Sequence, residues 1–332
     1  MGIKSLTNTI KKEAPESIIH ENLYKLSGKK VAVDASLIIY QNLLNIGNRP
    51  LFKNSKGKIT NHLSGLFYKI VNYQSLNIEM IFIFDGKPPE IKSDTINDRK
   101  KKCDDAKEKM NTCENKEDKD KYEKASLRLT KEIINDVKKL LTLMGVSYIH
   151  PDGEAEAYAS ELCRIGYVDY VLTEDMDTLV YGCPKLIRNC IDKSIKRKDI
   201  ISIFNYDKMI EDLNLTHDQF IEFCILCGCD YCNSIPKVGN ITALKLIKKF
   251  GNIDEIIKNT KYNFPENYLE LFNKSKEIFL MWKDKINVNE INIVKSEKNV
   301  SELIHYLVLE IEMNETKVHN GIKKSMTKIN MN

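Results

Sequence analysis

The sequence predicts an α/β fold in which a mostly parallel, twisted central sheet is flanked by helices. Three short apolar runs end in an acidic residue and helical patterns lie between them, which is typical of strands alternating with helices. The chain has 332 residues, a length that suits two domains or one large domain with an insertion. Of these residues 42% are hydrophobic, which is enough to form a core. This composition excludes a disordered chain. Because no uncharged apolar run reaches about 18 residues, we expect no membrane span and no membrane partner.

The three apolar runs define the predicted strands in chain order. Residues 30–34 are rich in β-branched side chains and lead into a helical pattern that reaches Leu44. Residues 80–85 are almost entirely apolar, as in a strand covered on both faces, and residues 169–173 lead into an acidic segment. Parallel sheets place their sites at the carboxyl ends of strands, so we expect these acids to lie at one edge of the sheet.

Helical patterns cover residues 61–73 and 154–165, and the stretch 92–140 differs from both. Its part 99–123 is dense in Lys, Asp and Glu and grades into an amphipathic helix. The apolar positions of that helix are Leu127, Leu129, Ile133, Ile134, Val137, Leu140 and Leu141. The charge run predicts a solvated insertion or a charged helical pair, and the alternative is a mobile arm that becomes ordered on a polyanion.

From Asn205 onward the pattern is helical throughout. The predicted helices cover residues 206–213, 216–227, 242–250 and 253–257, with one or two more between 301 and 332. We interpret this part as a helical subdomain appended to the sheet.

Charge and cysteine content bound the compartment and the partners. The formal net charge of +4 permits nucleic-acid binding without requiring it. Nine cysteines, an odd number, occur in a chain without a secretory signal, so we expect a reducing intracellular compartment and free thiols. Four of them have the spacing of a zinc or iron–sulfur site, but two of the four fall in an apolar helical pattern, which favours buried thiols. These are Cys224, Cys227, Cys229 and Cys232.

Seven carboxylates at predicted element boundaries carry the strongest chemical signal. They are Asp34, Asp85, Glu154, Glu156, Asp175, Asp177 and Asp230. Any one alone is interpreted as a helix cap or a surface acid. Glu154 and Glu156 would lie about 200° apart on a helix, so they share a site only if they straddle its N-terminus. Converging carboxylates repel each other unless a cation lies among them, and oxygen ligands without histidine suit Mg²⁺ or Mn²⁺. Seven acids suffice for two ions, an arrangement suited to phosphodiester hydrolysis.

These acids fall in six sequence blocks that resemble the flap endonuclease family of structure-specific 5′ nucleases over nearly the whole chain. The blocks are Met1-Gly2-Ile3, Val33-Asp34-Ala35-Ser36, Phe84-Asp85-Gly86-Lys87-Pro88-Pro89, Gly153-Glu154-Ala155-Glu156-Ala157, Thr173-Glu174-Asp175-Met176-Asp177 and Gly228-Cys229-Asp230-Tyr231-Cys232. The resemblance implies a PIN-like nuclease core, a helical arch insertion and a helix–two-turn–helix subdomain. It also implies that the seven acids hold two Mg²⁺ ions, for which Mn²⁺ can substitute.

The same resemblance divides the chain by function. It implies an N-terminal nuclease half (1–105), the arch (92–140), an internal nuclease half (141–225), the helix–two-turn–helix region (226–300) and a short C-terminal helical tail (301–332).

The resemblance also assigns roles to basic and aromatic residues. It implies that Lys92 and Arg99, seven residues apart, contact the scissile phosphate and stabilise charge in the transition state. It places Tyr40 in a stack with an unpaired base beside the cut and Gly2 near the active site. Further expected DNA contacts are Arg49, Lys69, Lys124, Arg128, Lys131, Gly228, Gly239 and Lys245, together with Glu154 and Asp230.

Residues 234–240 predict a turn that enters a helix, whose free amides suit a phosphate. The segment resembles the family's two-turn motif, in which main-chain carbonyls hold a K⁺ ion against the uncleaved strand; here they would belong to Ser234, Ile235 and Val238. Lys237 stands where the family usually has the first glycine of the turn. A lysine at this position needs a permissive backbone angle, or it contributes its own charge to DNA binding.

We therefore expect a Mg²⁺-dependent 5′ flap endonuclease that cuts branched DNA near the single-strand/duplex junction in replication and repair, leaves a 5′-phosphate and has added 5′→3′ exonuclease activity. The alternatives are a 5′→3′ exonuclease or gap/junction endonuclease of the same superfamily and, more remotely, a non-catalytic DNA-binding module. The expected partner is DNA with a 5′ flap, bound by a monomer in the nucleus or another site of DNA replication. The sequence ends without the clamp-binding box of relatives, so we expect no sliding-clamp recruitment through one.

Overall fold

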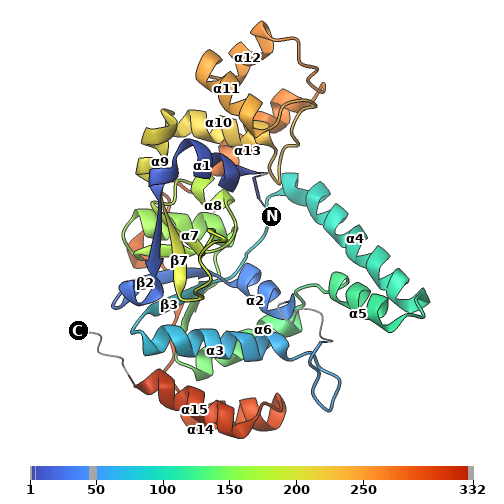
Figure 1. Cartoon of the computed structure of the whole chain (residues 1–332), viewed down its shortest axis with the longest axis vertical. Coiled ribbons are helices and arrows are strands. Elements are labelled where there is room, and N and C mark those ends of the chain that lie inside the picture. Colours follow the sequence, from blue (N-terminus) through green and yellow to red (C-terminus); the bar gives the residue numbers. More distant parts are fainter. Residues whose placement is uncertain (1, 4, 45–50, 328–332) are drawn as a thin grey trace. The chain divides into compact units, whose positions relative to one another are not determined.

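The computed structural model describes residues 2–3, 5–44 and 51–327 (Figure 1). The chain divides into two compact units, each assembled from segments that are distant in sequence. Unit 1 comprises Met1–Lys25, Gly86–Lys92 and Asp152–Ile291, and unit 2 comprises Leu26–Asp85, Ser93–Pro151 and Asn292–Asn332. The five functional regions that the resemblance implies have other boundaries than these two units, and they stay a prediction.

Four strands form the sheet of unit 1. In spatial order they are β1 (Ile18–Asn22), β7 (Ile200–Asn205), β6 (Lys185–Asn189) and β5 (Tyr170–Leu172). The pair β5–β6 is parallel, whereas β6–β7 and β7–β1 are antiparallel. The sequence predicts β5 but not the other three, because their short runs mix polar and apolar residues.

Helices make up the rest of unit 1. They are α1 (Leu6–Glu13), α7 (Ala155–Arg164), α8 (Asp177–Val180), α9 (Tyr206–Leu213), α10 (His217–Cys227), α11 (Asn240–Phe250), α12 (Ile253–Asn259) and α13 (Tyr268–Leu280), with short turns η1 (Pro15–Ser17), η3 (Glu90–Lys92) and η4 (Val288–Glu290). Polar side chains cap three of these helices: Asn205 caps α9, Thr216 and Gln219 form a capping box at α10, and Asn252 caps α12. Their apolar faces meet in one core that includes Phe220, Phe223 and Phe272.

Unit 2 carries a second set of four strands. In spatial order they are β2 (Lys30–Asp34), β3 (Glu79–Ile83), β4 (Ser147–Ile149) and β8 (Ile293–Val294). The pairs β2–β3 and β3–β4 are parallel, and β4–β8 is antiparallel. Strand β8 corrects the expectation that everything after Asn205 is helical, since these two residues pair with the edge of β4.

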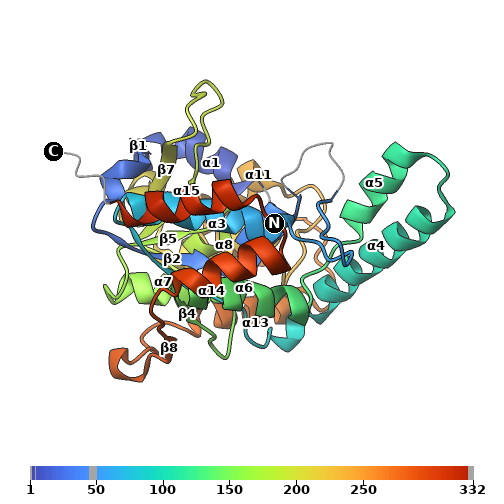
Figure 2. The same cartoon turned by 90° about the horizontal axis from the view of Figure 1, so that it is seen from below.

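The helices of unit 2 form a layer and a separate pair. They are α2 (Ala35–Leu44), α3 (Asn61–Ser75), α4 (Ser93–Thr112), α5 (Lys116–Ala125), α6 (Lys131–Leu143), α14 (Val300–His305), α15 (Glu315–Met326) and the π-helical turn η5 (Tyr306–Glu310), and the turn η2 (Leu23–Leu26) lies at the unit's boundary. Helix α3 packs against α2, α6 and α15, and α14 packs against α6 (Figure 2).

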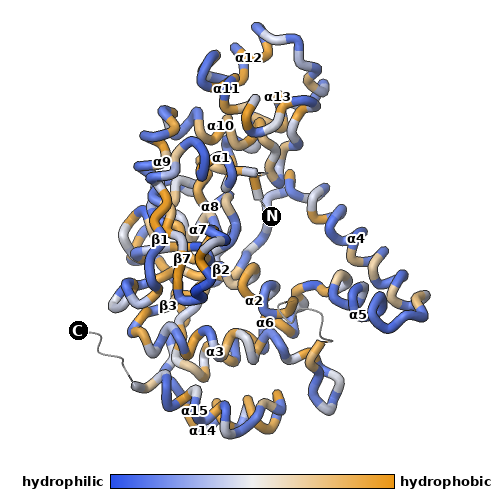
Figure 3. The backbone as a smooth tube through the Cα atoms, in the orientation of Figure 1, coloured by the Kyte–Doolittle hydropathy of each residue, from blue (hydrophilic) through white to orange (hydrophobic). Residues whose placement is uncertain are grey.

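Helices α4 and α5 pack against each other and form the charged pair that the sequence predicts. Their backbone is coloured mostly hydrophilic along its length (Figure 3). Only Ala106 of α4 is buried, and α5 buries no residue. The amphipathic helix begins later than expected, because the Thr130 side chain accepts a hydrogen bond from the amide of Ile133 and caps α6. Leu127 and Leu129, which were expected on its apolar face, therefore precede the helix.

The predicted α/β class is confirmed. The strand pairing is mixed, because β4 and β6 each pair with one parallel and one antiparallel strand. In the described parts of the chain, none of the helices combines the length and the apolarity that a bilayer crossing requires.

Candidate active site

Five of the seven predicted metal ligands lie in unit 1, and we call them the carboxylate cluster: Glu154, Glu156, Asp175, Asp177 and Asp230. Glu154 is the N-cap of α7 and Glu156 lies in its first turn, so the pair straddles a helix start as the sequence predicts. Asp177 is the first residue of α8, and Asp230 follows α10. Each of these acids thus stands where an element begins or ends.

Lys92, at the end of η3, is a cation among these acids. Its Nζ donates a hydrogen bond to Oε1 of Glu154 and lies 3.3 Å from Oδ2 of Asp230, and its side chain is 12% exposed. Burial alone lowers the pKa of Lys92, but the negative charges of Glu156, Glu154 and Asp230 outweigh it, and the pKa rises above its ordinary value. Lys92 is therefore protonated at neutral pH.

Asp175 and Asp177 are held by backbone amides. The amide of Ile3 donates to Oδ1 of Asp177 at 2.8 Å, and the amide of Asp177 donates to Oδ1 of Asp175 at 3.1 Å. Burial raises the pKa of both carboxyls, and the charge of Asp230 raises both further. Burial is the main cause of both shifts, and the repulsion by Asp230 adds to it.

Gly2 lies against the same two aspartates. Its φ is +84°, and a Cβ added there would lie 2.1 Å from Oδ1 of Asp175 and 2.5 Å from Oδ1 of Asp177. Both the backbone angle and the close approach require glycine. The sequence pattern indicated this position only through the resemblance.

Two tyrosines that the sequence reasoning missed bind Glu154. The hydroxyl of Tyr181 donates to Oε2 of Glu154 at 3.2 Å, the hydroxyl of Tyr231 also donates to Oε2, and the two hydroxyls lie 2.9 Å apart. Burial raises the pKa of both phenols, so they stay protonated and donate. The spacing of four residues from Asp177 to Tyr181, one helical turn, is a signal that could have found the first.

The donor chemistry of the carboxylate cluster fits hard divalent cations. Among the described residues, no three His, Cys, Asp or Glu side chains are arranged as they stand to ligate one metal ion. Nonetheless, five carboxylates interact with the ammonium of Lys92, and oxygen ligands of this kind bind Mg²⁺ or Mn²⁺. Glu154, Glu156, Asp175, Asp177 and Asp230 are therefore the residues of unit 1 that would hold such ions.

The other two predicted ligands, Asp34 and Asp85, lie in unit 2. Asp34 ends β2 and is 5% exposed, and its Oδ1 accepts a hydrogen bond of 3.0 Å from the amide of Leu37 at the start of α2. Asp34 is opposite Ile83 in the parallel pair β2–β3, and Asp85 follows two residues later. The two acids therefore lie at the same end of these strands, as expected.

The predicted DNA contacts of unit 2 lie on several elements. Arg99 is on α4, Tyr40 on α2, Lys69 on α3, Lys124 on α5 and Lys131 at the start of α6, whereas Arg49 lies outside the described residues. Burial raises the pKa of Tyr40, and Lys69 Nζ lies 5.9 Å from the centroid of the Tyr73 ring.

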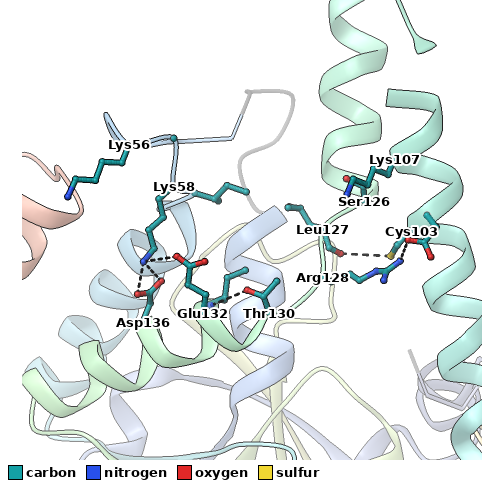
Figure 4. A pocket seen from close by; sticks show the side chains of 14 residues that line it. Lys56, Lys58, Cys103, Lys107, Ser126, Leu127, Arg128, Thr130, Glu132 and Asp136 are labelled. Atoms are coloured by element: carbon teal, nitrogen blue, oxygen red, sulfur yellow. Dashed lines mark hydrogen bonds and ion pairs between the residues drawn. The ribbon is translucent and has the colours of Figure 1, made fainter. Parts of the chain in front are cut away.

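Arg128 lies in the link between α5 and α6, so Lys124, Arg128 and Lys131 do not share one helix face. The guanidinium of Arg128 donates to Asp104 and, at 2.7 Å, to the carbonyl of Lys100 on α4. It lines a pocket of about 590 Å³ beside Cys103 and Lys107, with Lys58 and Asp136 on the other side (Figure 4).

The predicted DNA-binding turn of unit 1 has the backbone that the sequence requires. Lys237 is exposed and has a φ of +67°, in the left-handed region where glycine is preferred. Gly239 caps α11 with an extended backbone, and a Cβ added there would meet nothing within 4 Å. Of the three carbonyls expected to hold K⁺, that of Ile235 accepts a hydrogen bond of 3.2 Å from the amide of Val238.

Gly228 and Lys245 are the remaining predicted contacts. Gly228 ends α10 with a φ of +94°, and a Cβ there would lie 2.9 Å from the amide nitrogen of Ser234, so the turn requires glycine. Lys245 is exposed on α11.

The closely spaced cysteines that follow Phe223 are thiols at neutral pH. Burial raises the pKa of Cys227 and Cys229 to about 12 each and that of Cys232 to about 11. In the absence of a metal these groups are therefore not in the thiolate form that zinc and iron–sulfur clusters bind.

Comparison with known proteins bears on the same regions. The XPG N-terminal domain family matches residues 1–106, and the XPG I-region family matches residues 145–230. Flap endonuclease 1 of Glycine max is 38% identical over 335 residues, covering 98% of this chain and 86% of that protein. The structure of flap endonuclease-1 from Methanococcus jannaschii matches with a TM-score of 0.70 and 30% identity, over 93% of this chain and 95% of that one. The catalytic core of Rad2 in complex with DNA substrate matches with a TM-score of 0.72 and 20% identity, over 96% and 99% of the two chains, which shows a shared fold.

Proposed function

We infer that this chain, which belongs to the flap endonuclease family, is a structure-specific nuclease that hydrolyses phosphodiester bonds in DNA. We propose further that its substrate is branched DNA with a 5′ flap, cut near the single-strand/duplex junction in replication and repair. The observation that carries this proposal is the carboxylate cluster around Lys92, in which five buried or part-buried acids gather.

The proposed cofactor is a pair of Mg²⁺ ions, held by the carboxylate cluster together with Asp34 and Asp85. Bound there, such ions supply an activated water and neutralise the charge of the scissile phosphate. Lys92 is part-buried and protonated, and with Arg99 it would stabilise the charge that develops on the phosphate oxygens. Tyr40 would stack on the base next to the cut.

Duplex binding is proposed for the turn before α11. Lys237, Gly239 and Lys245 would contact the backbone of the uncleaved strand, and the carbonyls of Ser234, Ile235 and Val238 would hold K⁺ there. Specificity would then follow from the shape of the junction, because backbone contacts carry no sequence information. The arch residues Lys124, Arg128 and Lys131 would contact the phosphates of the 5′ strand.

Cleavage of labelled 5′-flap, blunt duplex and four-way-junction DNA, each with Mg²⁺ and with chelator, tests the proposal. We expect the fastest cleavage on the flap and none with chelator. Asp177→Asn should lower the flap rate by more than about hundredfold, because even residues that only orient a metal ligand change metal affinity or activity by about 10–100-fold. Asp254→Asn, at an exposed acid of α12, is the matched control. Near-normal cleavage by a folded Asp177→Asn variant would remove Asp177 from the site, and faster cleavage of blunt duplex or junction would favour the exonuclease or junction endonuclease.

A further inference from the structure

Glu154 uses its two carboxylate oxygens differently. Oε2 accepts hydrogen bonds from the hydroxyls of both Tyr181 and Tyr231, whereas Oε1 faces the ammonium of Lys92. Two neutral donors on one oxygen fix the rotation of the carboxylate group, because the phenols approach it from elements other than its own helix. Oε1 is thereby left pointing toward the positive charge.

A single ring of α13 holds both tyrosines. Phe279 is 2% exposed, and its ring centroid lies 5.1 Å from that of Tyr181 and 5.4 Å from that of Tyr231. The interplanar angles of 61° and 63° are those of edge contacts, which are favourable for aromatic pairs. A change at Phe279 would therefore loosen both donors of Glu154 at once.

The end of α13 also fixes the backbone in front of Glu154. A Cβ added at Gly153 would lie 2.3 Å from Cζ2 of Trp282, so the indole covers the residue directly before Glu154. Trp282 makes a further edge contact with Tyr158 of α7, at 5.8 Å between centroids. The side chain and the backbone of Glu154 are thus both held by aromatic residues near α13.

We propose that Tyr181 is a positioning residue for the metal-binding carboxylate of Glu154, and that Phe279 keeps Tyr181 in place. This inference rests on the proposed function, in which Glu154 is one of the ligands of a divalent cation. Residues that hydrogen-bond a metal ligand orient it toward the ion. Tyr181 contacts neither cation nor DNA in this role and acts through Glu154 alone.

Calorimetric titration of the full chain with Mn²⁺ alone tests the proposal. Tyr181→Phe keeps the ring against Phe279 and removes only the donor, and we expect its Kd for Mn²⁺ to rise about tenfold. Phe279→Leu should also raise the Kd. The matched control is Tyr206→Phe, which removes another buried hydroxyl, one that is bonded to His217. Emission of Trp282, the single tryptophan of the sequence, checks that the aromatic layer stays packed in each variant.

The outcomes are separable. A Kd for Mn²⁺ that rises in Tyr181→Phe but not in Tyr206→Phe, together with cleavage that recovers at higher Mn²⁺, supports the positioning role. An unchanged Kd in Tyr181→Phe, or an equal loss in Tyr206→Phe, overturns it while leaving the proposed function intact. Absence of Mn²⁺ binding by the unaltered chain would overturn the proposed function, and the positioning role with it.

Discussion

The backbone amide of Ile3 donates a hydrogen bond of 2.8 Å to Oδ1 of Asp177, joining residues 174 positions apart in the sequence. Asp177 is 4% exposed, so this amide is a protein donor to a carboxylate that is withdrawn from water. Gly2 and Ile3 thus lie directly against the carboxylate cluster, at Asp175 and Asp177.

Gly2→Ala should disrupt this arrangement. A methyl group at Gly2 would overlap the carboxylate oxygens of Asp175 and Asp177, and it would strain a backbone at φ +84°. We expect the Mn²⁺ affinity and the flap-cleavage rate to fall by about tenfold to hundredfold, as for other changes next to metal ligands. Gly166→Ala is the control, since its φ is +74° but its Cβ would meet nothing within 4 Å. Equal activities for the two variants would mean that only backbone strain matters at Gly2.

Lys237→Gly should raise the stability of the fold and weaken its binding to duplex DNA. Glycine relieves the cost of a left-handed backbone at φ +67°, so the free energy of unfolding should rise by about 1 kcal/mol. The lost charge should weaken duplex binding and lower the slope of log K against log salt by about 0.9. Lys237→Ala removes the same charge but keeps the strain. Equal stability of the alanine and glycine variants would show that the left-handed backbone at residue 237 does not lower the stability of the fold.

Arg128→Gln should weaken binding of the single-stranded 5′ flap. The arginine is bound to Asp104 and to the carbonyl of Lys100, so we expect it to exchange Asp104 for a phosphate when DNA binds. The salt slope for single-stranded DNA should fall by about 0.7, and Asp104→Asn should raise affinity by freeing the guanidinium. Lys323→Gln on α15 is the control for charge alone. Identical salt slopes in Arg128→Gln and Lys323→Gln would exclude a phosphate contact at Arg128.

His62 should make the free energy of unfolding depend on pH. Burial and the nearby charge of Lys58 lower the pKa of His62 from 6.5 to about 4, and neither ring nitrogen has a hydrogen-bond partner among the described residues. Between pH 6.5 and 4 the unfolded chain binds a proton at His62 that the folded chain does not, so stability falls as the pH falls through this range.

This lowering of the His62 pKa corresponds to a loss of up to about 3 kcal/mol in the free energy of unfolding when the pH falls to about 4. Urea denaturation at pH 7 and pH 5 should show a smaller loss for His62→Phe than for the unaltered chain. The exposed histidine variant His319→Phe should behave like the unaltered chain. A pH dependence that His62→Phe leaves unchanged would contradict the assigned cause.

Strands β2 and β3 could be predicted from sequence because burial makes them continuous apolar runs. The parallel strands β4 and β6 could not, since they are short or begin and end in polar residues. The antiparallel strands β1 and β7 could not, since their polar and apolar residues alternate or mix and the pairing joins residues such as Ile18 and Phe204. Such long-range pairing leaves no local signal.

The candidate site shows the same limit. The acids were identifiable because paired carboxylates at element boundaries are costly without a cation, which makes the residue type itself informative. Tyr181 was marked only by its spacing of one helical turn from Asp177, and Phe279 was not identifiable, because a phenylalanine in a helical pattern is usually a core residue. Only the fold brings the ring of α13 to the tyrosine that binds Glu154.

Anomalous diffraction from crystals grown with Mn²⁺ tests the metal site most directly. We expect manganese peaks in ligand contact with Glu154, Asp175 and Asp177 or their neighbours in the carboxylate cluster, and with Asp34 and Asp85. Ordered carboxylates with no manganese peak beside any of these seven acids would contradict this expectation.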